Sequence, residues 1–300
     1  MPSKVNVDEL QAIARRIRRN IIGMTAAAQS GHPGGSLSCA DIMVAIYWGL
    51  LRHDPRNPHW PERDRFVMSK GHASPAMYAT LAEAGYFPTE ELLTFRQLGS
   101  RLQGHNVIGK PPGVEMSAGA LGMGLSFSLG LALAGRLDGK DYRVYCLLGD
   151  GDCQEGQTWE AILAAAHHSV DNLTAIVDRN HIQNDGFSDY ARFPGGNGQR
   201  PQRPGGWVRE DLHTVNVMSL DPFPEKWQAF GWYVQEVDGH DIPAIIAALE
   251  NARAHRGQPG VVIAQTTKGK GVSFMENNPD FHGKATTPEQ TEQALQELAD

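Results

Sequence analysis

The chain has 300 residues, 41% of them hydrophobic and 20% charged, and this composition excludes a mainly disordered protein. Its 27 basic and 34 acidic residues give a net charge of −7, which argues against a nucleic-acid binder that depends on a basic face. No apolar run is long enough for a membrane span, and a polar N-terminus with three cysteines and no Cys-x-x-Cys motif fits a cytoplasmic protein.

The N-terminal third is expected to be mainly helical. Residues 7–28 carry apolar side chains at steps of three and four, and Asn6 is placed to cap this helix. Further helices are expected from Ser38 through Leu51 and over about 75–84. Three polar or glycine- and proline-containing stretches are expected to be loops, at 30–35, 52–63 and 97–115.

From residue 119 onward, the pattern changes to short apolar strands that alternate with helices. The expected strands are 143–148, 173–177, 233–237 and 261–266. One helix is expected to end near Gly135, and three more are expected over 155–168, 222–230 and 241–254. This alternation is typical of an α/β fold with a doubly wound, mostly parallel sheet and helices on both faces, in which ligands bind at the carboxyl ends of the strands. Residues 1–300 are expected to form a single domain.

A Gly/Pro/Arg-rich insert interrupts this alternation at about 187–216, with Pro-Gly-Gly at 194–196 and again at 204–206. A long stretch of this kind inside a compact domain is often a lid, a binding loop or disorder. We hypothesise that it borders a binding site, because arginines there could hold a phosphate or another acidic group.

Gly149-Asp150-Gly151 follows a predicted buried strand. The glycines let backbone N–H groups approach an anion, and Asp150 suits a hard cation bound between the carboxylate and phosphate oxygens. Asn180 follows the next predicted strand, so one βαβ unit would bring it beside Asp150. The spacing fits a Mg²⁺–diphosphate site, and it equally fits a strand-end turn with a capping Asp and a turn Asn.

The string GDGDCQEGQTWEA at 149–161, with Asn180 about thirty residues after it begins, resembles the thiamine-diphosphate motif of transketolases. Other strings that resemble this family are SGHPGG at 30–35, SKGHASPAMYA at 69–79, LQGH at 102–105, SAGALGMG at 117–124, DGHD at 238–241 and TTKGKGVSF at 266–274. They keep the family's order over nearly the whole chain. Only the first of three transketolase domains is matched, which implies the N-terminal subunit of a split transketolase.

The resemblance implies two cofactors, thiamine diphosphate and Mg²⁺ (or Ca²⁺). The metal would be held by Asp150, Asn180 and the backbone carbonyl of Ile182, an all-oxygen set that suits such a cation. The other residues that would contact the cofactor are Gly119, Leu121, Gly122, Gly149 and Gly151.

The resemblance also implies the reaction, which moves a two-carbon ketol unit from a ketose phosphate to an aldose. The cofactor supplies the electron sink, and the protein moves protons on and off hydroxyls, a task that suits histidine near neutral pH. By resemblance, His32 and His282 would lie near the hydroxyl that is deprotonated, and His72 and His105 would bind hydroxyls of the ketol fragment.

A second polypeptide is implied, because nothing in this sequence matches the pyrimidine-binding domain that carries the activating glutamate, or the C-terminal domain. Two copies of each chain are expected, with the active site between the chains. Glu155 and Glu160 match acidic residues that face the partner and link two active sites in the family, although an acidic first helical turn would give the same pattern. No nucleic-acid or membrane partner is expected.

Three alternatives stay open at this stage. The chain could serve an enzyme similar to deoxyxylulose-phosphate synthase, or a transketolase specialised for an unusual sugar. It could also be a non-catalytic subunit that binds the cofactor without turnover. An assembled complex that binds the cofactor but transfers no ketol unit would favour this alternative.

Overall fold

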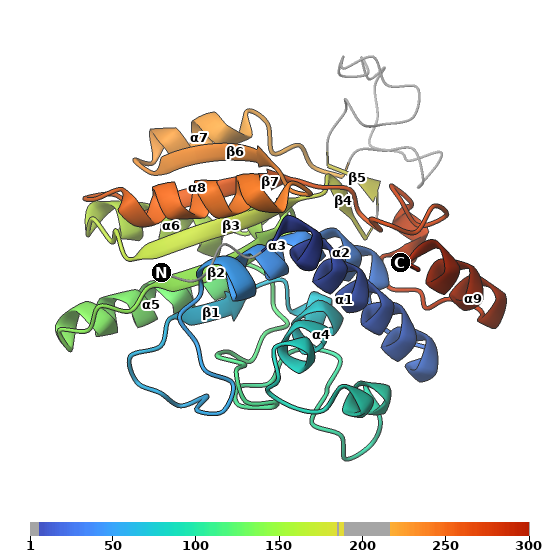
Figure 1. Cartoon of the computed structure of the whole chain (residues 1–300). Coiled ribbons are helices and arrows are strands. Elements are labelled where there is room, and N and C mark those ends of the chain that lie inside the picture. Colours follow the sequence, from blue (N-terminus) through green and yellow to red (C-terminus); the bar gives the residue numbers. More distant parts are fainter. Residues whose placement is uncertain (1–5, 185, 189–216, 300) are drawn as a thin grey trace, which may run out of the picture.

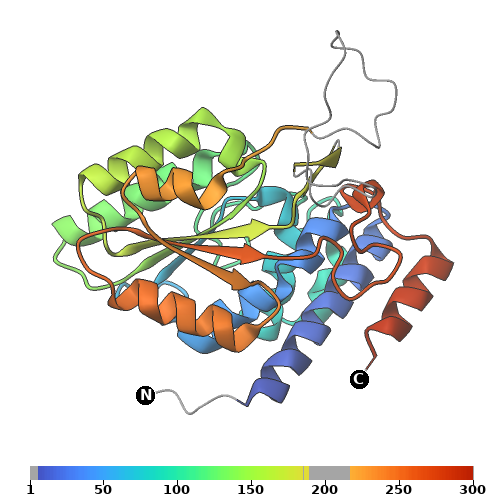
Figure 2. The same cartoon turned by 90° about the horizontal axis from the view of Figure 1, so that it is seen from above.

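The computed structural model describes residues 6–184, 186–188 and 217–299, and it shows a parallel sheet with helices on both faces (Figures 1 and 2). The strand order is β1-β2-β3-β7-β6, and every neighbouring pair is parallel. The strands are β1 (Arg65–Met68), β2 (Val144–Gly149), β3 (Leu173–Arg179), β6 (Tyr233–Asp238) and β7 (Gly260–Gln265). The predicted fold class is therefore confirmed.

Two sets of helices cover the two faces of this sheet. One face carries α1 (Val7–Ala28), α2 (Pro33–Ser38), α3 (Ala40–Val44), a π-helical turn (Ala45–Leu50), α4 (Ser74–Glu83) and α8 (Ile242–Ala254), with α9 (Pro288–Glu297) against α1. The other face carries α5 (Met123–Leu137), α6 (Gly156–His167) and α7 (Phe223–Ala229). Short 3₁₀ turns cover Gly71–Ala73, Thr89–Thr94, Asp152–Gln154 and Pro279–Phe281, and β4 (Ile182–Gln183) pairs with β5 (Gly186–Phe187) as a small antiparallel ribbon.

Side chains along the central strands alternate between two hydrophobic clusters, one under each set of helices. On β3, Ile176 packs with α1–α4 and α8, whereas Ala175 and Val177 pack with α5–α7. On β7, Val262 and Ile263 divide in the same way. This burial on both faces explains why the strands read as continuous apolar runs in the sequence.

The order of the strands reverses beyond β3. The chain passes through β1, β2 and β3 in spatial order, crosses to the edge strand β6, and returns to β7 beside β3. Ligands bind at such a reversal of strand order. Gly149 of β2 pairs with Asp178 of β3, so Asp150 and Asn180 leave the sheet at adjacent strand ends, as predicted.

Several elements differ from the prediction. β1, only four residues long, was not predicted, and α2 begins at Pro33 inside a stretch predicted to be a loop. The helix predicted from Ser38 is interrupted at Cys39 and ends as a π-helical turn, and α9 was also missed. No described helix is long and apolar enough to cross a membrane. Most of the predicted insert, residues 189–216, lies outside the described residues.

Gly124 of α5 provides a test of how closely this helix packs against the loop after β1. A Cβ atom at Gly124 would lie 2.3 Å from Cβ and 2.7 Å from Cα of Ser69, so Gly124→Ala must push the two segments apart. We expect the free energy of unfolding to fall by about 1–3 kcal/mol in urea titrations of the isolated chain.

Gly130→Ala in the same helix is the matched control, because a Cβ there meets nothing within 4 Å. Its stability should be unchanged or higher by up to about 1 kcal/mol. Equal losses for the two variants would contradict the close packing at Gly124.

Candidate active site

The carboxyl ends of β2, β3 and β7 surround a cavity of about 290 Å³. Seven of the predicted cofactor residues line it: Gly119, Leu121, Gly149, Asp150, Gly151, Asn180 and Ile182. Gly122, the eighth, does not line the cavity. Its backbone N–H donates to Asp152 Oδ1 (2.8 Å), and because Asp152 Oδ2 accepts from the N–H of Gly149 (2.9 Å), this buried carboxylate ties the loop before α5 to the end of β2.

Asp150 is held at the cavity wall by two donors. Its Oδ1 accepts from Arg179 Nη1 (2.6 Å), and its Oδ2 accepts from the backbone N–H of His181 (2.7 Å). Each carboxylate oxygen has a further lone pair, so Asp150 can still ligate a cation. Arg179 is buried and also reaches Asp221 Oδ1 (3.4 Å), a contact that no pattern in the sequence indicated.

The amide of Asn180 is oriented by its neighbours. Its Nδ2 lies 3.3 Å from both Ser38 Oγ and Asp178 Oδ2, so the nitrogen faces these groups. Its Oδ1 accepts from the backbone N–H of Ile182 (3.2 Å) and keeps a second lone pair for a cation. Together with Asp150 and the carbonyl of Ile182, this oxygen gives a donor set that fits a hard divalent cation. Among the described residues, no three His, Cys, Asp or Glu side chains gather to hold a metal.

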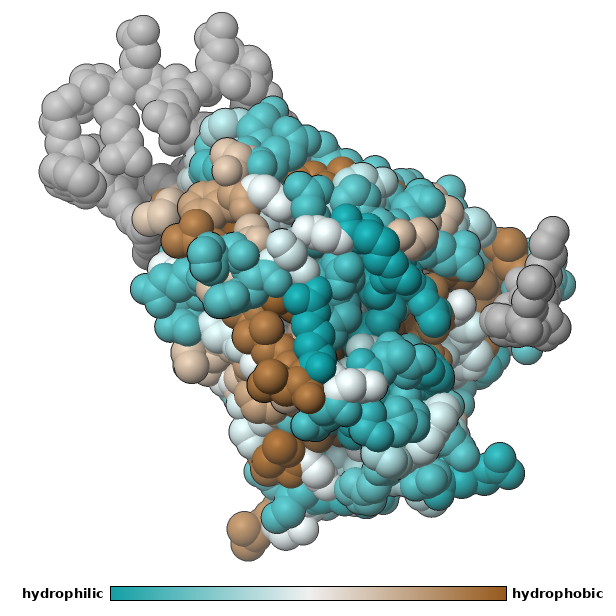
Figure 3. Space-filling view, turned by 90° about the vertical axis from the view of Figure 1, so that its left-hand side faces the viewer, coloured by the Kyte–Doolittle hydropathy of each residue, from teal (hydrophilic) through white to brown (hydrophobic). Residues whose placement is uncertain are grey.

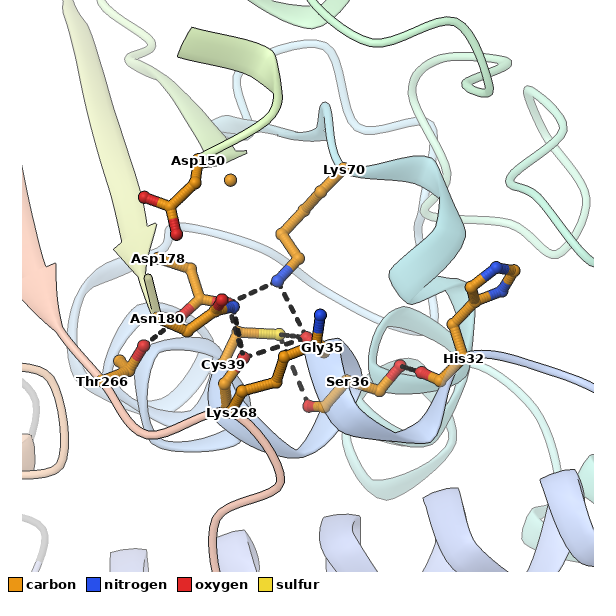
Figure 4. A network of polar contacts seen from close by, with 12 residues as sticks. His32, Gly35, Ser36, Cys39, Lys70, Asp150, Asp178, Asn180, Thr266 and Lys268 are labelled. Atoms are coloured by element: carbon orange, nitrogen blue, oxygen red, sulfur yellow. Dashed lines mark hydrogen bonds and ion pairs between the residues drawn. The ribbon is translucent and has the colours of Figure 1, made fainter. Parts of the chain in front are cut away.

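A buried ion pair between Lys70 and Asp178 lies under the cavity (Figure 4). Lys70 Nζ also donates to the carbonyl of Gly35 (2.8 Å), while Asp178 accepts from Ser38 Oγ (2.6 Å) and from Thr266 Oγ1. Burial alone would lower the pKa of Lys70 and raise the pKa of Asp178. Burial is the largest single effect on each group, but the attraction between them, together with the hydrogen bonds to Asp178 and the other nearby charges, outweighs it. The pKa of Lys70 is therefore raised and that of Asp178 is lowered.

Lys268 is a second buried cation at the cavity, and none of the described carboxylates lies within ion-pair distance of it. Its Nζ donates to the carbonyl of Ile182 (3.0 Å) and lies 2.8 Å from His282 Nδ1. Burial, with the charge of Lys70, lowers the pKa of Lys268 to about 7. An anion in the cavity would therefore meet an ammonium group without a carboxylate partner.

The structure brings all four predicted histidines together beside the cavity. The ring centroid of His32 lies 5.4 Å from that of His72, 6.1 Å from His105 and 5.3 Å from His282. The rings of His72 and His282 stack at 5.2 Å, and both line the cavity. His105 is the most exposed of the four, so the cluster leads from the cavity to the surface.

These four imidazoles are neutral at physiological pH. Burial, reinforced by Arg96 and other positive charges, lowers the pKa of His32 to about 4, and burial beside Lys268 lowers that of His282 to about 3. The pKa values of His72 and His105 are also lowered, mainly by burial. A neutral imidazole can accept a proton at one nitrogen and donate at the other, as acid–base chemistry on hydroxyls requires.

Glu155 and Glu160 lie apart from the cavity, at the start of α6, and both are exposed. Glu155 is the N-cap residue of this helix, and its Cβ would lie 2.5 Å from a Cβ placed at Gly122. Their predicted role toward a partner chain remains a prediction. The alternative, an acidic first turn, is wrong, because Glu155 precedes the helix and Glu160 follows its first turn, which contains no acidic residue.

Sequence comparison identifies relatives along nearly the whole chain. The family described as "Transketolase, thiamine diphosphate binding domain" matches residues 10–194 and 212–299. The chain is 40% identical over 300 residues to one subunit of the apulose-4-phosphate transketolase of Actinobacillus succinogenes, covering 100% of this chain and 99% of that protein. It is 38% identical to the 6-deoxy-6-sulfo-D-fructose transketolase subunit SqwG of a Clostridium species, covering 97% and 96%.

Longer relatives match only in part. The Homo sapiens transketolase is 38% identical over 301 residues, which are 99% of this chain and 43% of that protein. The crystal structure of the transketolase from Campylobacter jejuni superposes with a TM-score of 0.82 at 33% identity, covering 98% of this chain and 43% of that one. The chain therefore spans less than half of these longer proteins.

The histidine cluster predicts a specific pH dependence of stability. Because the folded-state pKa values are lowered, the unfolded chain binds protons between about pH 6.5 and pH 4 that the folded chain does not. The free energy of unfolding should therefore fall as pH falls through this range. Urea titrations at several pH values should show a smaller loss for His282→Gln than for the wild type.

His59→Gln is the control for this measurement, because His59 is exposed and lies outside the cluster. It should lose stability with falling pH as the wild type does. A wild-type protein whose unfolding free energy is flat between pH 6.5 and pH 4 would contradict the lowered pKa values.

Proposed function

The chain belongs to the transketolase family as a thiamine-diphosphate-binding N-terminal subunit, and from this premise we propose that it transfers a two-carbon ketol unit from a ketose phosphate to an aldose acceptor together with a second polypeptide. The observation that carries the proposal is the single cavity at the ends of β2, β3 and β7, which joins Asp150, Asn180 and Lys268 to the histidine cluster. A non-catalytic subunit would not need this combination.

We propose that the cavity holds the diphosphate and a Mg²⁺ ion. Asp150, Asn180 and the carbonyl of Ile182 would ligate the ion, and the lack of a carboxylate partner supports Lys268 as the residue that meets the diphosphate. Backbone at Gly119 and Gly151 lets the cofactor approach closely. When bound, thiamine diphosphate would supply the electron sink for breaking and forming the carbon–carbon bond.

The histidines would move the protons of this reaction. A charged Lys268 can only donate, so it fixes His282 Nδ1 as an acceptor and leaves the ring proton on Nε2. His32 would exchange a proton with a substrate hydroxyl, a role that its position between His72, His105 and His282 supports. The lowered pKa values support this role, because each imidazole stays uncharged and able to accept a proton.

We propose that the partner subunit covers the outer face of α5 and α6. Met123, Phe127 and Leu137 are exposed at helical spacing along α5, and Leu163 is 59% exposed on α6. Figure 3 views the molecule from the side where these helices lie, and it shows hydrophobic residues gathered in a band there. This face continues into the cavity wall, because Leu121 lines the cavity two residues before α5 begins, so a partner here would also close the cavity.

The two relatives that match end to end favour a second candidate, a transketolase specialised for an unusual sugar. One is named for apulose-4-phosphate and the other for 6-deoxy-6-sulfo-D-fructose. We propose that the substrate here likewise carries a terminal anionic group.

We further propose an assembly of two copies of each chain. We also propose a cytoplasmic location, which the free, buried cysteines Cys39, Cys146 and Cys153 support.

The proposed function is tested by isolating the complex that this chain forms in its native host. We expect a second chain to co-purify, and the complex to transfer a ketol unit from a ketose phosphate to an aldose only with thiamine diphosphate and Mg²⁺. The chain alone should be inactive. A complex that binds the cofactor but transfers no ketol unit would contradict the proposal.

Phe127→Glu tests the proposed interface. It should abolish co-purification without lowering the thermal midpoint of the isolated chain, because Phe127 is partly exposed and a surface charge costs little there.

Lys268→Met tests the cofactor site. Loss of a charge-assisted contact to the diphosphate should weaken thiamine-diphosphate binding to the complex by about 10- to 100-fold, measured by calorimetry at saturating Mg²⁺. Wild-type affinity should also fall as pH rises from 7 to 9, because Lys268, with its pKa near 7, must take up a proton to bind the anion. Lys270→Met is the control, since Lys270 is more exposed and lies near Glu276 (3.7 Å); it should bind like the wild type.

A further inference from the structure

Arg96 stands at the outer end of the histidine cluster. Its charge acts on both His32 and His105, the two rings nearest the surface end. Its backbone lies in the left-handed region (φ 59°), which is uncommon for a residue other than glycine, and its N–H donates to the carbonyl of Leu102 (2.9 Å). The loop therefore holds this residue in a specific conformation beside the route from the surface to the cavity.

The guanidinium of Arg96 is fixed between the two segments that carry these histidines. Nη1 donates to Ser30 Oγ (2.6 Å), two residues before His32. On the other side it lies against Gly104, where a Cβ would come within 2.6 Å of Nε and Nη2, so only glycine leaves this space. The planar donor group is thus anchored by Ser30 and lies beside Gly104, next to both segments that carry these histidines.

Arg96 also differs from the arginines around it in its charge partners. Arg101, five residues later, pairs with Glu91 through two bonds of 2.6 and 2.8 Å, and Arg16 pairs with Glu83. Among the described residues, no carboxylate lies within ion-pair distance of Arg96, and its hydrogen bond to Ser30 uses one of its donors. A positioned, exposed guanidinium with donors to spare is suited to bidentate binding of a phosphate or another tetrahedral anion.

We propose that Arg96 binds the terminal anionic group of the sugar substrate. The inference rests on the proposed function and deepens it, because it assigns the recognition of that anion in part to this chain. A sugar whose reacting carbon lies in the cavity would run its hydroxyls along the histidines and bring its far end toward the surface, where Arg96 lies.

The test compares two acceptors in the assembled complex, D-glyceraldehyde 3-phosphate and D-glyceraldehyde, with one fixed ketose donor. Arg96→Gln should raise KM for the phosphorylated acceptor by about 10- to 100-fold and leave KM for the unphosphorylated acceptor unchanged. Arg96→Lys, which keeps the charge but loses the planar fork, should give an intermediate KM. Arg101→Gln is the matched control and should behave as the wild type with both acceptors.

The outcomes separate the two proposals. A wild-type complex that transfers no ketol unit to either acceptor would contradict the proposed function itself. A wild-type complex that is active, with Arg96→Gln changing both acceptors equally or neither, would overturn the role of Arg96. An equal change accompanied by a shift in the pH profile of kcat/KM would assign Arg96 to the electrostatics of His32 and His105 instead.

Discussion

The ion pair between Lys70 and Asp178 is the interaction on which the cavity depends. Two charges removed from water must compensate each other, and here they also collect the hydrogen bonds that satisfy both groups. Through those bonds the pair joins the end of β3 to the loop after β1, to α2 and to the end of β7. These segments lie far apart in the sequence, so the pair can form only when the sheet has its native strand order.

Because of this ion pair, Lys268 rather than Lys70 is the buried lysine whose charge is available to a ligand. Asp178 compensates Lys70, whereas Lys268 contacts only carbonyl groups and His282 among the described residues. The clustered histidines are neutral, so they add hydrogen-bonding capacity without adding charge. A protein with a net charge of −7 therefore presents, within its described part, a buried ammonium group without a carboxylate partner at the carboxyl ends of its strands. An ammonium group in this position attracts an anion.

Local sequence patterns were sufficient to predict the helices and strands with a clear hydrophobic periodicity, and the motifs that directly follow strands. β2, β3 and the placement of Asp150 beside Asn180 agree with prediction. The four predicted histidines lie together in the structure, and their roles stay predictions. β1 was missed because four residues between charged segments carry too little periodicity. The partners of Lys70 and Lys268 were missed for a different reason: each lysine lies in a family-like string, but Lys70 meets a carboxylate 108 positions away, and only the folded sheet reveals that contact.

Helix α5 has buried polar contacts on its cavity side and exposed apolar side chains on its outer side. On the cavity side, Asp152 accepts hydrogen bonds from Gly122, Gly149 and Ser69, which tie the loop before the helix to β2 and to the loop after β1. On the outer side, the apolar side chains of the same helix have no cover within the described chain. A partner that buries this face would therefore dock onto a surface that is already ordered, and little of its binding free energy would be spent on shaping the cofactor site. On the proposed assembly, buried polar contacts would preorganise the cavity wall on this chain, and apolar burial against the partner would close it.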